Sequence, residues 1–236
     1  MMRDSTKTKK DQQKIKKIRI GVLASGSGTD LQSIIDAIEN ELLDGTIVIV
    51  LSDNKDAYAL KRAEKHNIAT MFFDPKKKHR KTYDEEITGI MQKYQVDLII
   101  GAGYMRLFSK EFVDHWFGRL INIHPALLPS FKGVCGQSDA LDYGVKITGC
   151  TTHFIDDQID HGPIILQAAV KVEETDTVDS LKERILKVEH QILPRTIQLF
   201  AENRLHIKGR RVHIDPGSSW RQKIDILPDV LYPDAF

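Results

Sequence analysis

Residues 18–40 read IRIGVLASGSGTDLQSIIDAIEN, and this stretch decides the fold. The apolar run over residues 18–24 predicts a buried strand, and residues 31–40 have the apolar spacing of an amphipathic helix. The turn between them, SGSGTD (residues 25–30), is rich in glycine. A buried strand, a glycine-rich turn and a helix form the usual first unit of an α/β sheet with parallel strands.

The same alternation continues to residue 124. Further apolar, β-rich runs predict strands over residues 46–52, 69–74, 97–102 and 119–124. Helical patterns lie between them over residues 57–66, 83–94 and 109–116. Strands that are apolar along their whole length and alternate with helices are typical of a parallel sheet covered on both faces. We therefore expect a doubly wound α/β domain.

The second half of the chain has a different pattern. Residues 148–155 and 163–172 predict two antiparallel strands joined by the polar turn DDQIDHG. Residues 177–199 predict a long helix with one apolar stripe, which we expect Pro194 to kink or end near its last turns. Residues 205–214 predict a hairpin around Gly209.

Composition excludes several classes of protein. The chain has 236 residues with 34 Lys and Arg against 33 Asp and Glu, a net charge of +1, which argues against broad electrostatic binding to nucleic acid. Its two cysteines, Cys135 and Cys150, are too few for a secreted disulfide framework and too isolated for a zinc site. No apolar run is long enough to cross a membrane, and the N-terminus has no secretory signal. We expect a soluble, cytoplasmic globular protein of mixed secondary structure.

The basic N-terminal arm, residues 1–17, departs from this near-neutral balance. It carries seven basic and two acidic residues, or +5, which leaves −4 for the rest of the chain. Because it has almost no apolar side chains, we expect a disordered, solvated tail. A polyanion-binding arm is the alternative.

The turn SGSGTD (residues 25–30) is the first candidate site. Free backbone N–H groups at a helix N-terminus bind anions, and glycine lets a ligand approach them. The spacing fits neither the dinucleotide fingerprint nor a Walker loop, so a single phosphate monoester suits it better. The structural alternative is a simple turn with Thr29 or Asp30 as the helix N-cap.

The second candidate site is the stretch INIHPALLPSFKG (residues 121–133). Asn122 and His124 point to the same side at the end of a predicted strand, where ligands bind in open α/β sheets. An amide donor beside a histidine can stabilise an oxyanion and move a proton. Each residue alone has a structural alternative, as a turn former or as a buried, hydrogen-bonded histidine.

The third candidate site is the turn within FIDDQIDHGPII (residues 154–165). It contains Asp156, Asp157, Asp160 and His161. Such carboxylates bind Mg²⁺ or keep an imidazole in its charged form. A solvated polar turn is the alternative.

These three segments, in this order, resemble the phosphoribosylglycinamide formyltransferase family. The resemblance covers residues 18–214 and includes GYMRLFS (103–109), TGCTTHFIDDQIDHGPI (148–164) and VEHQILP (188–194). It implies a Rossmann-like, mostly parallel sheet, the formyltransferase fold. The implied parts are a tail at 1–17, an N-terminal phosphate- and substrate-binding half at 18–124, a smaller C-terminal folate-binding half at 125–214 and a tail at 215–236.

The resemblance implies transfer of a formyl group from 10-formyltetrahydrofolate to the amine of 5-phosphoribosylglycinamide, a step of purine biosynthesis, with no metal required. Asn122, His124 and Asp160 match the family's catalytic residues. In that role the protonated His124 binds the oxyanion and moves the proton, Asp160 favours the charged imidazole, and Asn122 donates from its amide.

Other positions match the family's binding residues. Gly28, Thr29 and Asp30 match the loop that binds the substrate phosphate, and Glu189 matches an acidic residue that contacts the same substrate. The implied folate contacts are Arg80, Met105, Arg106, Leu107, Phe108 and Asn122.

Two residues depart from the family pattern. Asp30 stands where the family often has Asn, which places a carboxylate near a bound phosphate. Cys135 stands where a histidine is usual. We expect it to be a buried, inert cysteine, and a reactive thiol is the alternative.

Two other functions remain open from the sequence. A formyltetrahydrofolate deformylase would use the same three polar residues with water in place of the amine, but such enzymes carry an extra N-terminal domain for which the arm before Ile18 leaves no room. The second alternative is a non-catalytic phosphate-binding module, which would not need the three polar residues Asn122, His124 and Asp160. We expect small-molecule partners only, without nucleic acid or membrane, and a monomer or homodimer.

Overall fold

A computed structural model describes residues 17–76, 78–217, 227, 229–234 and 236. Apart from Lys17, the predicted basic arm lies outside these residues, as do parts of the predicted C-terminal tail.

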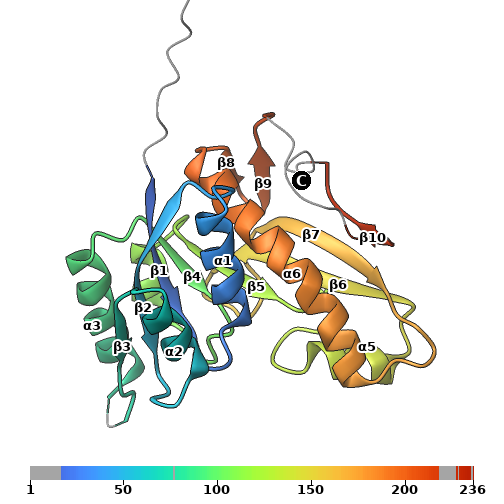
Figure 1. The fold of residues 1–236 in the computed structure, drawn as a ribbon, viewed down its shortest axis with the longest axis horizontal. Helices are drawn as coiled ribbons and strands as arrows, with labels where there is room; N and C mark the ends of the chain where they lie inside the picture. The colour runs from blue at the N-terminus through green and yellow to red at the C-terminus, as the bar shows by residue number, and fades with distance from the viewer. Residues whose placement is uncertain (1–16, 77, 218–226, 228, 235) are drawn as a thin grey trace, which may run out of the picture.

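One ten-stranded sheet forms the centre of the molecule (Figure 1). Its order is β3-β2-β1-β4-β5-β6-β7-β9-β8, with β10 paired to β7. Every neighbouring pair from β3 to β5 is parallel, as predicted. The parallel strands are β1 (Ile18–Leu23), β2 (Gly45–Ser52), β3 (Thr70–Phe72), β4 (Leu98–Gly101) and β5 (Leu120–His124).

The rest of the sheet is mostly antiparallel. β6 pairs antiparallel with both β5 and β7, and β8 with β9, as predicted for these two hairpins. β9 meets β7 in parallel at one residue pair, and β10 adds to β7 in antiparallel orientation. These strands are β6 (Ile147–Phe154), β7 (Ile164–Lys171), β8 (Leu205–Lys208), β9 (Arg211–Ile214) and β10 (Val230–Leu231).

Helices cover both faces of the parallel half. Alternate strand residues point to opposite faces, so Leu98 and Ile100 of β4 join one apolar core and Ile99 joins the other. The first core contains side chains of α1 (Thr29–Glu39), α2 (Tyr58–Lys65) and α6 (Val178–Ala201). The second contains those of α3 (Arg80–Lys93) and α4 (Lys110–His115).

The long helix α6 does not end at Pro194 but continues to Ala201. Proline inside a helix costs about 3 kcal/mol, because it removes one backbone hydrogen bond. Ile192, Leu193 and Ile197 flank the proline and are fully buried. Each such side chain contributes about 1.5–3 kcal/mol on burial, so the packing offsets the lost bond.

Two elements were not predicted from the sequence. α5 (Gly136–Tyr143) has only two buried residues, Gly136 and Ala140, and so has no apolar stripe to recognise. β10 is two residues long, and the residues that follow it bring Tyr232 and Phe236 into the first core. Within the residues that the structure describes, none of the helices combines the length and the apolar character that crossing a membrane requires.

Candidate active site

Asn122 and His124 lie at the end of β5, where Pro125 follows directly. The two side chains share one side of the strand, as the alternation predicts. His124 is buried and Asn122 is half-buried.

The His124 ring lies between two oxygen acceptors. Its Nε2 is 2.8 Å from the carbonyl oxygen of Phe131, and its Nδ1 is 3.4 Å from Oδ2 of Asp160. An imidazole nitrogen needs a hydrogen to bind either acceptor. The doubly protonated, charged ring is therefore the form that satisfies both contacts.

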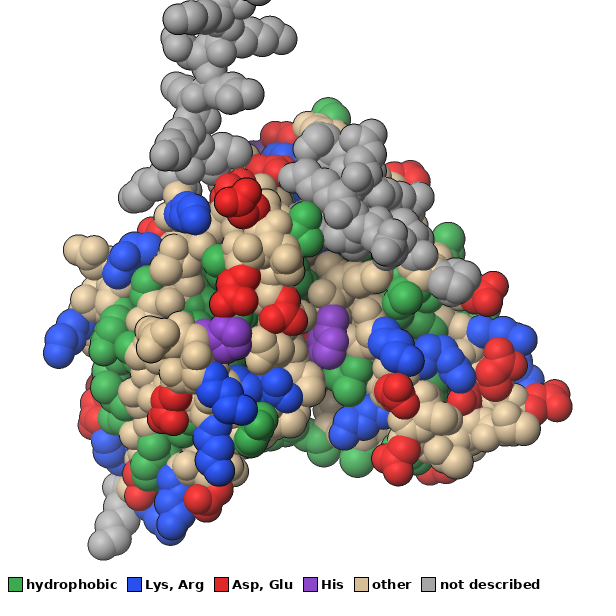
Figure 2. Space-filling view, in the orientation of Figure 1, with side chains coloured by type: hydrophobic (Ala, Val, Ile, Leu, Met, Phe, Trp, Pro, Cys, Tyr) green, Lys and Arg blue, Asp and Glu red, His purple; other side chains and the backbone are tan. Residues whose placement is uncertain are grey.

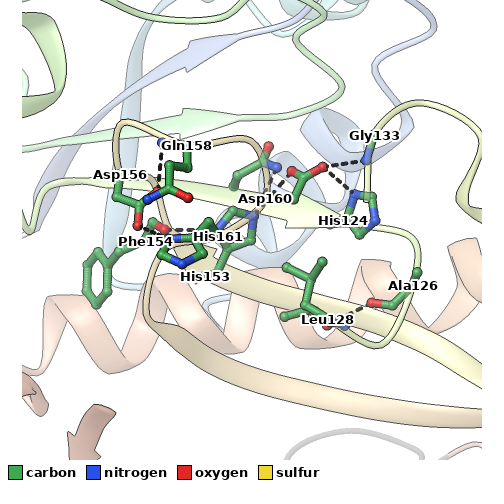
Figure 3. A network of polar contacts seen from close by, with 12 residues as sticks. His124, Ala126, Leu128, Gly133, His153, Phe154, Asp156, Gln158, Asp160 and His161 are labelled. Atoms are coloured by element: carbon green, nitrogen blue, oxygen red, sulfur yellow. Dashed lines mark hydrogen bonds and ion pairs between the residues drawn. The ribbon is translucent and has the colours of Figure 1, made fainter. Parts of the chain in front are cut away.

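Asp160 lies on the loop of residues 155–163 between β6 and β7, which we call the β6–β7 loop (Figure 3). Its Oδ2 accepts a hydrogen bond of 2.8 Å from the backbone N–H of Gly133 and faces His124. Its backbone is in the left-handed region, at φ 44°. The loop thus brings Asp160 to the histidine from 36 residues further along the chain.

His153 is a site residue that the sequence reasoning missed. It lies directly opposite Asn122 in the antiparallel pairing of β5 and β6. Its Nδ1 is 2.8 Å from the carbonyl oxygen of Phe154, so Nδ1 carries the hydrogen and Nε2 accepts from the Asn122 amide at 3.3 Å. Burial lowers the pKa of His153, which agrees with a neutral ring. His153 thereby fixes the orientation of the Asn122 amide.

Gly101 makes room for that amide. A Cβ at this position of β4 would lie 2.9 Å from Oδ1 of Asn122. Gly101, Asn122 and His153 occupy neighbouring strands in one row of the sheet, a register that no local sequence pattern shows.

A cavity of about 130 Å³ opens in front of Asn122 and Asp160. One wall is the β6–β7 loop, and the opposite wall is the segment after β4 together with the start of α3. The predicted folate contacts that line the cavity are Arg80, Arg106, Leu107, Phe108 and Asn122. Met105 is not among its lining residues; the side chain is exposed, and the backbone N–H binds Oγ of Ser25. His124 lies behind Asp160 and is not among the described residues that line this cavity.

Gly28 shapes the glycine-rich turn. It is the N-cap of α1 at φ 70°, and no side chain caps the helix. The alternative that Thr29 or Asp30 caps α1 is therefore wrong, because the helix begins at Thr29 and both residues belong to its first turn. The first-turn N–H groups have no side-chain cap, as an anion site requires.

Replacing Gly28 with alanine is expected to lower the free energy of unfolding by about 2–3 kcal/mol. The new Cβ would lie 2.7 Å from both Cα and Cβ of Ala59, and φ would stay positive. Gly26 is the matched control, because a Cβ there meets nothing within 4 Å. Chemical denaturation of both variants tests this, and equal losses for Gly28→Ala and Gly26→Ala would contradict it.

Arg62 of α2 is a second residue that the sequence reasoning missed. Its Nε donates to the carbonyl oxygen of Ser27 at 2.9 Å, and Nη1 donates to Gln32 at 3.2 Å. The guanidinium is thus held against the glycine-rich turn. Figure 2 shows that Lys and Arg side chains also gather on the lower part of the face of the molecule that it draws. Arg62 thus places a local positive charge beside the turn, although the body of the chain is acidic.

Asp30, which is partly buried, and Glu189, which is buried, are two carboxyl groups that interact near the same turn. Burial raises the pKa of Asp30 to about 6. Burial raises the pKa of Glu189 as well, and the charge of Asp30 adds to the effect. Nε2 of His190 is 3.8 Å from Oδ1 of Asp30, and neither atom has a hydrogen-bond partner among the described residues. A proton on one carboxyl group relieves the repulsion between the two.

Asp30→Asn is expected to be more stable than the natural chain at pH 7.5, by on the order of 2–3 kcal/mol, and equally stable near pH 4. The ordinary pKa of an aspartate is near 3.8, so between that value and about 6 the folded chain binds more protons than the unfolded chain. Stability of the natural chain therefore falls as pH rises through this window, and asparagine removes the loss. Denaturant titrations at both pH values measure it, with the exposed Asp36→Asn on α1 as control. A difference that does not change with pH would contradict the account.

Two other candidate groups have different surroundings from those predicted. Cys135 is exposed at the start of α5, so the expectation of a buried cysteine is wrong; the loop before this short helix is at the surface. Asp156 pairs with His161 rather than standing free to bind a cation. Among the described residues, no group of three or more His, Cys, Asp or Glu side chains is placed to hold a metal ion.

Known proteins are similar to this chain over most of its length. Residues 18–197 match the family model described as formyl transferase. Phosphoribosylglycinamide formyltransferase of Escherichia coli is 39% identical over 203 residues, which cover 84% of this chain and 94% of that protein. The trifunctional purine biosynthetic protein adenosine-3 of Bos taurus is 43% identical over 198 residues, 83% of this chain and 20% of that protein. The chain thus spans about a fifth of the length of this larger relative.

Solved structures share the fold. Glycinamide ribonucleotide transformylase 1 from Symbiobacterium toebii has a TM-score of 0.82 at 49% identity, covering 84% of this chain and 94% of that one. A formyltetrahydrofolate deformylase from Pseudomonas syringae has a TM-score of 0.78 at 26% identity, covering 84% of this chain and 66% of that one. The predicted fold class, a mostly parallel, Rossmann-like sheet, is confirmed.

Proposed function

The chain belongs to the formyl transferase family, and from this membership we propose that it transfers a formyl group from 10-formyltetrahydrofolate to the amine of 5-phosphoribosylglycinamide. The reaction is a step of purine biosynthesis. The observation that carries the proposal is that Asn122 and Asp160 line one cavity with His124 directly behind Asp160, in a chain similar over most of its length to an enzyme named for this reaction.

The chemistry is acyl transfer. The neutral amine attacks the formyl carbon, a C–N bond forms, and the carbonyl oxygen becomes an oxyanion. The amine nitrogen then loses a proton, the bond from the carbon to the folate nitrogen breaks, and that nitrogen takes up a proton. The products are the formylated glycinamide ribonucleotide and tetrahydrofolate.

Asn122 is proposed to stabilise the oxyanion. One hydrogen of its Nδ2 binds His153, and the second is free to donate to an oxygen in the cavity that Asn122 lines. Because His153 and Gly101 hold the amide in place, the donor needs no reorientation during the reaction, which is how preorganised donors lower a barrier.

Asp160 and His124 are proposed to move the proton. Asp160 lines the cavity and therefore meets the substrate amine first. His124 lies behind it, with Nδ1 at 3.4 Å, and its positive charge favours negative charge on the cavity side. His124 binds the oxyanion directly only when its ring releases the Phe131 carbonyl oxygen. The pair thus accepts the amine proton and returns it to the folate nitrogen, without a metal ion.

The substrates are proposed to lie on either side of these residues. The phosphate binds at Gly28, Thr29 and Asp30, where the α1 N-terminus is uncapped and Arg62 is adjacent. Glu189 contacts the same substrate. The folate binds in the cavity of Arg80, Arg106, Leu107, Phe108 and Asn122, with Met105 at its exposed edge.

The remaining assignments follow from the same activity. We propose substrate-binding and folate-binding halves at residues 18–124 and 125–214, with tails at 1–17 and 215–236. Both ligands are small molecules, so the activity needs neither nucleic acid nor a membrane. We place the enzyme in the cytoplasm, as a monomer or homodimer.

One assay separates this function from its alternatives. Consumption of 10-formyltetrahydrofolate is followed with and without 5-phosphoribosylglycinamide. Consumption that depends on the amine supports the proposal. Equal consumption without it indicates the deformylase, whose fold is similar, and no consumption in either case indicates a binding module.

A further inference from the structure

The β6–β7 loop carries Asp160 in a conformation that needs support. Asp160 has a positive φ of 44°, which a residue other than glycine rarely adopts. Two residues later, a Cβ on Gly162 would lie 1.8 Å from the carbonyl oxygen of Phe154, so the loop closes tightly on the end of β6. Six consecutive residues, 155–160, line the cavity. The position of this loop therefore sets the shape of the proposed folate site.

The side chain of Asp156 makes two contacts that hold the β6–β7 loop together. Oδ1 of Asp156 accepts from the backbone N–H of Gln158 at 3.0 Å, and Oδ2 is 2.7 Å from Nδ1 of His161 (Figure 3). Asp156 thus joins the first half of the loop to the residue that follows Asp160.

Arg210 reaches this loop from outside. The single residue pair between β7 and β9 is Ile164 with Arg211, which places the preceding residue, Arg210, beside the end of the loop. Its Nη2 donates to the carbonyl oxygen of His161 at 2.7 Å, and its Nη1 is 2.9 Å from Nε2 and 3.1 Å from Nδ1 of the ring.

The His161 ring lies between a cation and an anion. Arginine only donates hydrogen bonds and the carboxylate of Asp156 only accepts them, and the ring contacts both groups. His161 thereby connects the cation on the β8–β9 hairpin to the anion on the cavity wall. Lysine cannot reproduce the arrangement, because the two contacts use the two Nη groups of one planar guanidinium.

We infer that Arg210 is a positioning residue that holds the β6–β7 loop, through His161, in the shape that receives the formyl folate. This inference rests on the proposed function for its kinetic test. Arg210 touches neither proposed substrate, because it is absent from the residues that line the cavity in the described structure. Its side chain is exposed, so each contact is weak and the effect is moderate.

Arg210→Ala is expected to raise the KM for 10-formyltetrahydrofolate about three- to tenfold, with a smaller change in kcat and no change in the KM for the amine substrate. Arg211→Ala is the matched control, because it removes the same charge from the next residue, which is also exposed. Arg210→Lys is expected to recover part of the loss. In a His161→Ala background, Arg210→Ala is expected to raise the KM less than it does alone, because the ring contact is already gone.

Hydrogen–deuterium exchange provides a test that needs no substrate. Faster exchange over residues 155–163 in Arg210→Ala than in Arg211→Ala is expected. Equal exchange in the two variants, or equal KM values for the folate, would overturn the inference. If the natural chain transfers no formyl group, the proposed function fails, and the exchange experiment still decides the role of Arg210.

Discussion

Replacing His124 with alanine is expected to lower kcat by about 10²–10⁴-fold, the usual contribution of general acid–base catalysis. The variant leaves Asp160 without the imidazole that faces it at 3.4 Å, so the proposed pair that accepts and returns the amine proton is broken. Steady-state kinetics with saturating substrates measure the loss.

A second variant separates this loss from misfolding, because His124 is buried. His124→Asn keeps an amide donor near the position of Nδ1, so it is expected to fold. Because asparagine cannot carry the positive charge of the imidazole, its kcat is expected to fall by about as much as in His124→Ala. His115→Ala, at an exposed position of α4, is the control. A kcat in His124→Asn equal to that of the control would contradict the assignment.

Asp160→Asn is expected to lower kcat by about 10²–10³-fold. Asparagine has the same shape, still accepts from the backbone N–H of Gly133, and tolerates a positive φ, so the β6–β7 loop keeps its conformation. The variant loses only the negative charge, which is proposed to favour the charged His124 ring and to receive the amine proton.

Asp142→Asn is the matched control for that loss of charge, because Asp142 is exposed on α5. Circular dichroism and the denaturation midpoint confirm that both variants are folded. A kcat in Asp160→Asn within twofold of the natural enzyme would assign the proton transfer to another group.

The order of strands and helices could be read from the sequence, because its signals are local. Apolar runs and helical periodicity predicted each parallel strand and the helices between them, and the antiparallel pair after residue 147 was recognised by its polar turn. The motifs also predicted Asn122, His124 and Asp160 as catalytic residues through their resemblance to a known family, and this assignment stays a prediction.

Other features depend on packing that no local pattern shows. His153 belongs to the site because it lies opposite Asn122 in a register that only the folded sheet sets. Arg210 reaches His161 across 49 residues of chain because β9 starts beside β7. Pro194 stays inside α6 because the residues around it are buried in the core, which the proline rule alone does not consider.

The fate of the formyl carbon tests the central claim most directly. The enzyme is given 10-formyltetrahydrofolate labelled with ¹³C in the formyl group together with 5-phosphoribosylglycinamide, and the products are followed by NMR. The account predicts that the label appears as a formamide on the glycinamide nitrogen, at a rate that falls in His124→Asn and Asp160→Asn. Label released as free formate, at a rate that does not depend on the amine, would contradict it.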